Sequence, residues 1–153
     1  MSKMSLLMVF FISTSLFADC MEDRFGNSIC GEGDCLKGRS GHVACATADE
    51  GACMEDSSGD VICGAGDCVK GRSGHVACAS KENGSCMEDR RGNIICGAGD
   101  CMKGRSGNVS CATTEDGSCM QDRTGNVTCG AGPCKLSRSG KVSCQAPTQT
   151  HHK

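Results

Sequence analysis

The sixteen cysteines have the widest chemistry in this chain, because a cysteine can form a disulfide or bind a soft metal ion as a thiolate. They recur in four sets with identical internal spacing. Zinc and cluster sites usually contain close pairs such as C-x-x-C, whereas the nearest spacing here is C-x4-C. The even number, with none left over, predicts complete disulfide pairing, and metal binding is the minor alternative. The four sets are Cys20, Cys30, Cys35 and Cys45; Cys53, Cys63, Cys68 and Cys78; Cys86, Cys96, Cys101 and Cys111; and Cys119, Cys129, Cys134 and Cys144.

The other titratable side chains give a weak case for catalysis. Two of the four histidines lie in the last three residues, and the other two, His42 and His75, occupy equivalent positions in two copies. The third and fourth copies carry Asn108 and Lys141 at that position. Nothing in the sequence supplies a base within a concave, dry pocket. We predict that the chain is not an enzyme and uses no cofactor.

Arginine is the best candidate for binding a partner. An arginine recurs every 33 residues with a lysine two or three residues before it, as in Lys37 with Arg39. One hypothesis is that these basic turns line up and bind an extracellular polyanion or a protein surface. The favoured alternative is that these basic segments and acidic ones such as Glu88-Asp89 alternate and complement each other along the chain. The candidate binding residues are Arg39, Arg72, Arg105 and Arg138.

The repeated Gly-Arg-Ser-Gly also resembles an exposed tryptic bond on a disulfide-braced loop. A small secreted module of this kind could act as a serine-protease inhibitor. The loop predicted below is a tight turn, however, which is too short to enter an active-site cleft in extended form. Inhibition is therefore an alternative function and not the favoured one.

The N-terminal residues 1–18 have the pattern of a secretory signal peptide. Lys3 supplies the positive charge, an apolar segment follows at 6–12, and the segment ends at the small residue Ala18. The apolar segment is short for a membrane span, and nothing later in the chain resembles one. The sign-mixed net charge of −2 gives no pointer to nucleic acid. We therefore predict export to an extracellular or periplasmic compartment.

Internal repetition supplies the elements that must position these residues. The predicted repeats span 20–52, 53–85, 86–118 and 119–144, and a tail of 145–153 follows that is predicted to be disordered. Each repeat contains two similar half-repeats of eleven residues, separated by a linker, that align without a gap, such as Cys86 to Cys96 and Cys101 to Cys111. All eight halves place a glycine six residues after their first cysteine. The unit is therefore an eleven-residue module.

The turn defines the geometry of the module. Asp89-Arg90-Arg91-Gly92 fits a type I turn followed by a glycine in the left-handed region, which closes a hairpin with a bulge. Only glycine takes that conformation without steric cost. Pairing Asp89 with Asn93 then sets Cys86 directly opposite Cys96, within the distance that a disulfide needs.

This register favours a disulfide within every hairpin, although cross-bonding between half-repeats is not excluded by the sequence. Each bond would close a loop of eleven residues, and the chain-entropy model gives a stabilisation of roughly 2.5–3 kcal/mol for such a loop. Beyond residue 18 the only aromatic residue is Phe25, so hydrophobic burial is small. The predicted fold is all-β: an elongated row of short, disulfide-rich tandem hairpins with little hydrophobic core. The predicted function is a non-catalytic structural or surface-interaction role outside the cell.

Overall fold

The computed structural model describes residues 19–146, which form sixteen short strands and no helix. The predicted signal peptide and residues 147–153 of the predicted tail lie outside the described residues. Consecutive strands pair into eight separate antiparallel hairpins. The strands are β1 (Asp19–Glu22), β2 (Ser28–Gly31), β3 (Cys35–Lys37), β4 (Val43–Cys45), β5 (Cys53–Glu55), β6 (Val61–Cys63), β7 (Cys68–Lys70), β8 (Val76–Cys78), β9 (Cys86–Glu88), β10 (Ile94–Cys96), β11 (Cys101–Lys103), β12 (Val109–Cys111), β13 (Cys119–Gln121), β14 (Val127–Cys129), β15 (Cys134–Leu136) and β16 (Val142–Cys144).

The turn and register have the predicted form. In the β9/β10 hairpin, Cys86 lies opposite Cys96, and the N–H of Asp89 donates to the carbonyl of Asn93 at 2.8 Å. The N–H of Gly92 closes the turn onto the carbonyl of Asp89 at 3.2 Å. The turn glycine has a positive φ in all eight hairpins, between 84° and 98°. The left-handed glycine is therefore confirmed in every copy.

Eight disulfides join the paired cysteines, one within each hairpin. Each bond spans ten residues of sequence and links Cα atoms 4.0 to 4.1 Å apart. No cysteine is free, and no disulfide connects one hairpin to another. The within-hairpin pairing is confirmed, and the cross-bonded alternatives are not observed.

An aspartate stabilises the turn from inside in the first hairpin of each repeat. The carboxylate of Asp89 accepts the backbone N–H groups of Arg91 at 2.8 Å and Asn93 at 2.9 Å. The side-chain amide of Asn93 donates to the same carboxylate at 3.1 Å. Hydrogen bonds from the side chain and then the backbone of Asn93 are the main reason that the pKa of Asp89 lies below its ordinary value. The second hairpins hold glycine or serine at this position: Gly38, Gly71, Gly104 and Ser137.

The hairpins stack face to face, and the disulfide of each hairpin packs on the backbone of the preceding one. A sulfur of the second hairpin, in Cys35, lies 3.1 Å from the carbonyl oxygen of Asp19 in the first. Its partner Cys45 lies 3.6 Å from the carbonyl oxygen of Ile29. The same arrangement recurs along the row, for example between Cys101 and Ser85 at 3.1 Å. Disulfides therefore fill the layers that apolar side chains fill in larger domains.

The hydrophobic core is correspondingly small. The most buried apolar residues are three alanines that follow the last cysteine of a repeat: Ala46, Ala79 and Ala112, each 1% exposed or less. No large side chain is fully buried among the described residues. Linker backbones bond to one another across these alanines, as in the N–H of Asp34 donating to the carbonyl of Gly51 at 3.0 Å. The prediction of little core is confirmed.

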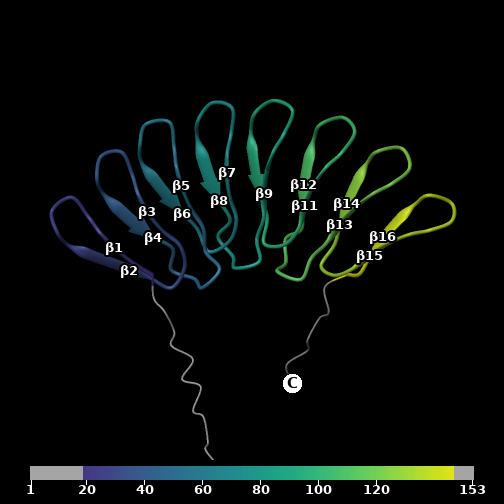
Figure 1. Ribbon diagram of the computed structural model, residues 1–153. Coiled ribbons are helices and arrows are strands. Elements are labelled where there is room, and N and C mark those ends of the chain that lie inside the picture. The colour runs from purple at the N-terminus through teal and green to yellow at the C-terminus, as the bar shows by residue number, and fades with distance from the viewer. Residues whose placement is uncertain (1–18, 147–153) are drawn as a thin grey trace, which may run out of the picture.

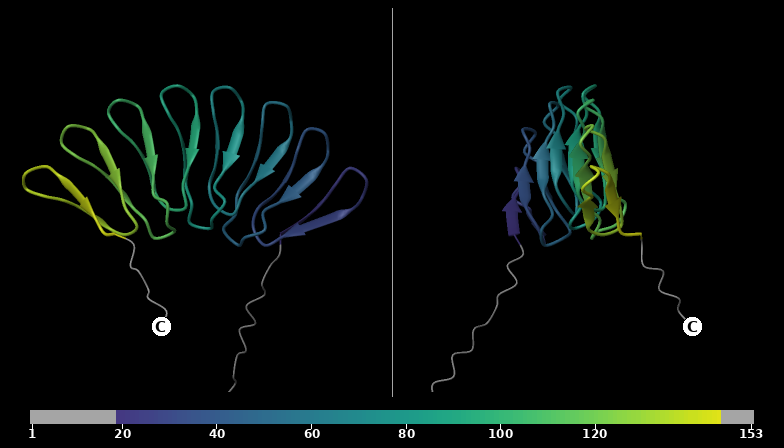
Figure 2. Two further views of the ribbon diagram at one scale, coloured as in Figure 1. Left: turned by 180° about the vertical axis from the view of Figure 1, so that it is seen from behind. Right: turned by 90° about the vertical axis from the view of Figure 1, so that its right-hand side faces the viewer.

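The eight hairpins form a curved fan (Figure 1). Their turns lie along the convex outer edge, and the linkers lie along the inner edge, where both ends of the described chain also emerge. Seen from the side, the fan is thin and gently twisted (Figure 2). Among the described residues there is no helix that could cross a membrane.

Candidate functional site

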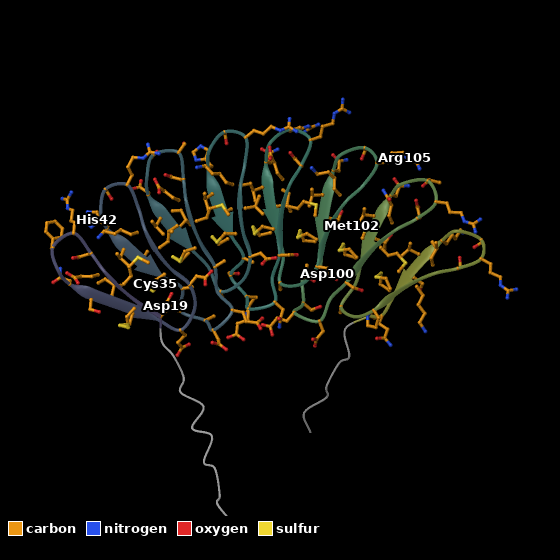
Figure 3. The ribbon with its side chains drawn as sticks, in the orientation of Figure 1. Asp19, Cys35, His42, Asp100, Met102 and Arg105 are labelled. Carbon is orange, nitrogen blue, oxygen red and sulfur yellow. A yellow bond between two sulfur atoms is a disulfide. The ribbon has the colours of Figure 1, made fainter. Side chains whose placement is uncertain are left out.

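The convex edge of the fan consists of the eight hairpin turns, and we call it the turn edge. It contains nine arginine and lysine residues, all of them exposed. The seven linkers form the opposite, linker edge, which contains nine acidic residues and the single cation Lys81. Nitrogen-bearing side chains extend outward from the turns in Figure 3, and oxygen-bearing ones gather along the linkers. The turn edge comprises residues 23–27, 38–42, 56–60, 71–75, 89–93, 104–108, 122–126 and 137–141; the linker edge comprises 31–34, 46–52, 64–67, 79–85, 97–100, 112–118 and 130–133.

Backbone hydrogen bonds between successive turns hold the main chain of three arginines, Arg24, Arg90 and Arg105, in place. The N–H of Arg90 donates to the carbonyl of Gly107 in the next turn at 2.8 Å, and Arg105 bonds to Gly125 in the same way at 2.9 Å. A Cβ placed on Gly107 would lie 2.5 Å from the Cβ of Arg90. The turn glycine is therefore needed for its positive φ and, where the preceding turn comes as close as Arg90 comes to Gly107, also because it has no Cβ. The sequence indicated only the first reason.

Two of the predicted binding residues, Arg39 and Arg72, form ion pairs with the following hairpin. Arg39 lies 3.7 Å from Glu55, and Arg72 lies 3.5 Å from Glu88. Both arginine side chains are about three-quarters exposed, at 77% and 76%, so water screens these pairs. At these two junctions, acidic and basic hairpins contact each other as the alternative interpretation of the sequence expects.

Lysines in the same two repeats are also bonded within the fan. The ammonium of Lys37 donates to the carbonyl of Glu22 at 3.1 Å, and that of Lys70 donates to the carbonyl of Glu55 at 3.0 Å. These bonds join the second hairpin of each repeat to the first. These lysines, like Arg39 and Arg72, thus help to hold neighbouring hairpins together.

The other two predicted residues, Arg105 and Arg138, have different surroundings. The hairpin after Arg105 presents Gln121 where the earlier repeats have glutamate, and the Gln121 side chain donates to the carbonyl of Gly125 at 3.1 Å. Arg138 belongs to the last of the eight hairpins in residues 19–146, so no later hairpin in this range lies beside it. Within residues 19–146, neither guanidinium has a hydrogen-bond or ion-pair partner. These two cations are available to a ligand.

Five further cations lie on the turn edge beside the four predicted ones. Most share the position of the predicted arginines in the other hairpin of their repeat, and this repetition was the signal that could have identified them. Arg24 differs from the rest because its guanidinium donates to the carbonyl of Ser40 at 2.9 Å and lies over the ring of Phe25 at 4.6 Å. The five are Arg24, Arg90, Arg91, Arg123 and Lys141.

The remaining chemical candidates are dispersed. His42 and His75 lie exposed on two turns, and His42 faces Phe25 with their ring centres 6.0 Å apart. Shallow grooves on the flank of the fan are lined by small residues and disulfides, such as one of about 420 Å³ between Cys111 and Cys144. Residues 19–146 contain no cluster of histidine, cysteine and acidic side chains that could hold a metal ion. Of the candidate residues described, the arginines and lysines gather most clearly on one surface, and that surface is the turn edge.

Comparison of the chain with protein-family models, with curated proteins and with solved structures finds no match. The geometry of the hairpin row and its charges therefore indicate where a partner would bind. Both single out the turn edge.

Proposed function

We propose that the protein is a non-catalytic, extracellular binding scaffold that presents its turn edge to an extracellular partner. The observation that carries this proposal is the alignment of nine cations along one edge of a disulfide-braced array. The linker edge opposite has the reverse charge, so the two edges would attract different partners.

Preorganisation supports a binding role. Each turn is closed at its base by a disulfide, and half of the turns are stabilised from inside by an aspartate such as Asp89. Backbone bonds between turns, such as Arg90 to Gly107, restrict them further. Binding of a partner to this edge would therefore cost little backbone conformational entropy in the fan.

The disulfides support the extracellular part of the proposal. Eight disulfides in a chain with so little core are typical of proteins in oxidising compartments, where such bonds persist. The predicted signal peptide of residues 1–18 agrees with export.

Protease inhibition is supported less well by the turn geometry. The N–H of Gly38 donates to the carbonyl of His42 at 2.9 Å, and the N–H of Gly41 donates to the carbonyl of Gly38 at 2.8 Å. Arg39 is thus held inside a closed turn, whereas a substrate-like loop must bind in extended form.

A panel of immobilised surfaces tests the proposed function. The folded protein would be passed over a sulfated glycan, a neutral glycan, collagen and lipid vesicles. One variant changes four turn-edge residues (Arg39, Arg72, Arg105 and Arg138, each to Gln), and a control variant changes three linker-edge residues (Asp34, Asp67 and Asp100, each to Asn). We expect retention on at least one surface, weakened by the turn-edge variant and kept by the linker-edge variant. Retention on none of the surfaces, or loss in the linker-edge variant alone, would overturn the proposal.

A further inference from the structure

We propose that the turn edge of the last four hairpins is the binding site, and that its ligand is a linear anionic polysaccharide. This inference rests on the proposed function and adds the location of the site and the class of ligand. The site consists of Arg90, Arg91, Arg105, Arg123, Arg138 and Lys141, all exposed.

The charge of the fan changes steadily along its length. Residues 19–52 contain seven acidic and three basic side chains, and 53–85 contain five and three. Residues 86–118 contain five and four, and 119–146 contain one and four. A polyanion is therefore repelled by the N-terminal end of the fan and attracted to the C-terminal end.

The turn edge itself shows the same asymmetry. The first four turns hold three cations and three acidic residues, one of which is Asp60. The last four hold six cations and two acidic residues, Asp89 and Asp122. Both of these carboxylates accept hydrogen bonds from their own turns, so part of their charge is already compensated by N–H groups.

Internal bonding separates the two halves further. The three turn-edge arginines of the first half, Arg24, Arg39 and Arg72, bond or pair within the fan. The six cationic groups of the second half have no such partner anywhere in 19–146. Gln121 accounts for this difference at Arg105, because a glutamate at that position would pair with Arg105 as Glu55 pairs with Arg39. Only the second half therefore offers uncommitted cations.

Shape favours a flexible chain as the ligand. The turns follow a convex arc, so a flat membrane would touch only a few of them at once (Figure 1). A linear polymer can bend along the arc and meet successive turns. Single-stranded nucleic acid usually requires aromatic side chains for base stacking, and the last four turns have none.

The type of cation indicates the anionic group. Five of the six residues are arginines, whose planar guanidinium forms paired hydrogen bonds with sulfate, carboxylate or phosphate groups. A sulfated or uronic-acid polysaccharide carries such groups at regular intervals. Each exposed contact is weak, so affinity would come from several turns acting together.

Two charge-matched variants of the full chain provide the test, with a fluorescent heparin oligosaccharide as the probe. The C-terminal variant changes Arg90, Arg91, Arg105, Arg123 and Arg138 to Gln. The N-terminal variant changes Arg24, Lys37, Arg39, Lys70 and Arg72 to Gln and removes the same charge. We expect the Kd, measured by anisotropy at about 0.15 M salt, to rise more than about tenfold in the C-terminal variant and less than about threefold in the other. Mass spectrometry of the non-reduced proteins would verify that both keep eight disulfides.

The outcomes separate this inference from the proposed function. Equal losses in the two variants would overturn the location but leave the turn edge as the binding surface. Absence of heparin binding by the unmodified protein, or tighter binding to anionic vesicles or to single-stranded DNA, would overturn the ligand class. If the surface panel also showed no retention, the proposed function itself would fail.

Discussion

Asp89 shows how much of this fold is determined by single residues. Its carboxylate binds two backbone N–H groups of its own turn, and Asp23, Asp56 and Asp122 do the same in the other first hairpins. The pKa of each of these carboxyl groups is held below its ordinary value by hydrogen bonds. The largest contribution comes from the side chains of Asn27, Asn93 and Thr124 for Asp23, Asp89 and Asp122, and from the backbone N–H of Asp60 for Asp56.

Acid should loosen these four turns selectively. Because the folded pKa is the lower one, the stabilisation is complete above the unfolded value of about 3.9 and is lost as pH falls through the folded value. We expect hydrogen-exchange protection of the Arg91 and Asn93 amides to fall in that range. Asp89→Asn keeps an acceptor oxygen but cannot titrate, so protection in this turn should become independent of pH. A loss of protection in the variant that matches the unmodified protein would contradict this explanation, and the Asp122 turn serves as an internal control.

Two glycines allow the two roles of the turn glycine to be separated. Gly26 and Gly107 have nearly equal φ values, 84° and 86°. A Cβ on Gly26 would meet only the end of the Glu22 side chain, at 3.5 Å, whereas a Cβ on Gly107 would meet the Cβ of Arg90 at 2.5 Å.

Alanine should therefore be tolerated better at Gly26 than at Gly107. Gly26→Ala should cost about 1–2 kcal/mol for the left-handed conformation alone. Gly107→Ala should cost a further 1–3 kcal/mol, roughly, because the neighbouring turn must move. Thermal unfolding of both variants measures the difference in stability. Equal losses would show that the close approach of neighbouring turns does not affect stability.

The hairpin is the element that could be predicted in full from the sequence. Its turn, register and disulfide all depend on eleven consecutive residues, as Asp89, Gly92 and the pair Cys86–Cys96 show. The stacking of hairpins was not predictable in the same way. It depends on contacts of sulfur with carbonyl oxygen, such as Cys35 with Asp19, and backbone atoms leave no pattern in the sequence.

The candidate site, too, could be predicted only in part. The repeated arginines were visible in the sequence, including Arg105 and Arg138. The sequence did not show that Arg39 and Arg72 form ion pairs and Arg105 and Arg138 do not, because this depends on which side chain of the next hairpin reaches each arginine. Gln121 in place of glutamate was the visible sign, but its meaning required the contact between Arg39 and Glu55.

Removing a disulfide should affect interior and terminal hairpins differently. Cys86 is 8% exposed and packs inside the row, whereas Cys20 and Cys30 are both exposed at its end. Changing Cys86 and Cys96 to Ser should cost about 2.5–3 kcal/mol and lower hydrogen-exchange protection in the hairpins on both sides. The same change at Cys20 and Cys30 should unfold only the first hairpin. Protection losses confined to one hairpin in both variants would show that the hairpins are not coupled.

At the scale of the whole molecule, the two terminal hairpins carry substitutions that close the row. A Cβ on Gly38 would lie 3.0 Å from Val61 of the next hairpin, so in the second hairpin of a repeat this position must stay small when another repeat follows. The last hairpin has Ser137 there. Pro133 replaces the aspartates whose N–H groups bond to the next linker, as Asp34 bonds to Gly51. In the first hairpin, Ser28 replaces the valine or isoleucine that faces a preceding hairpin.

Two deletions of similar size test whether these substitutions act as caps. Deleting residues 86–118 removes an interior repeat and keeps both ends, so the product should remain a monomer by light scattering. Ending the chain at residue 118 removes the last repeat and leaves the face around Gly104 without its neighbour, so this product should self-associate. Monomeric behaviour of both deletions would show that the last hairpin is not a cap.

The position of the disulfides also determines how the chain would respond to tension. Because each bond joins cysteines ten residues apart, the hairpin loops carry no load when the two ends of the chain are pulled. Only the linkers can lengthen, by about 3.3–3.6 Å for each residue as a hairpin leaves the stack. The fan would thus open one hairpin at a time, in short steps, and could close again with every covalent loop intact. A row of this kind can lengthen under load without the loss of any hairpin loop.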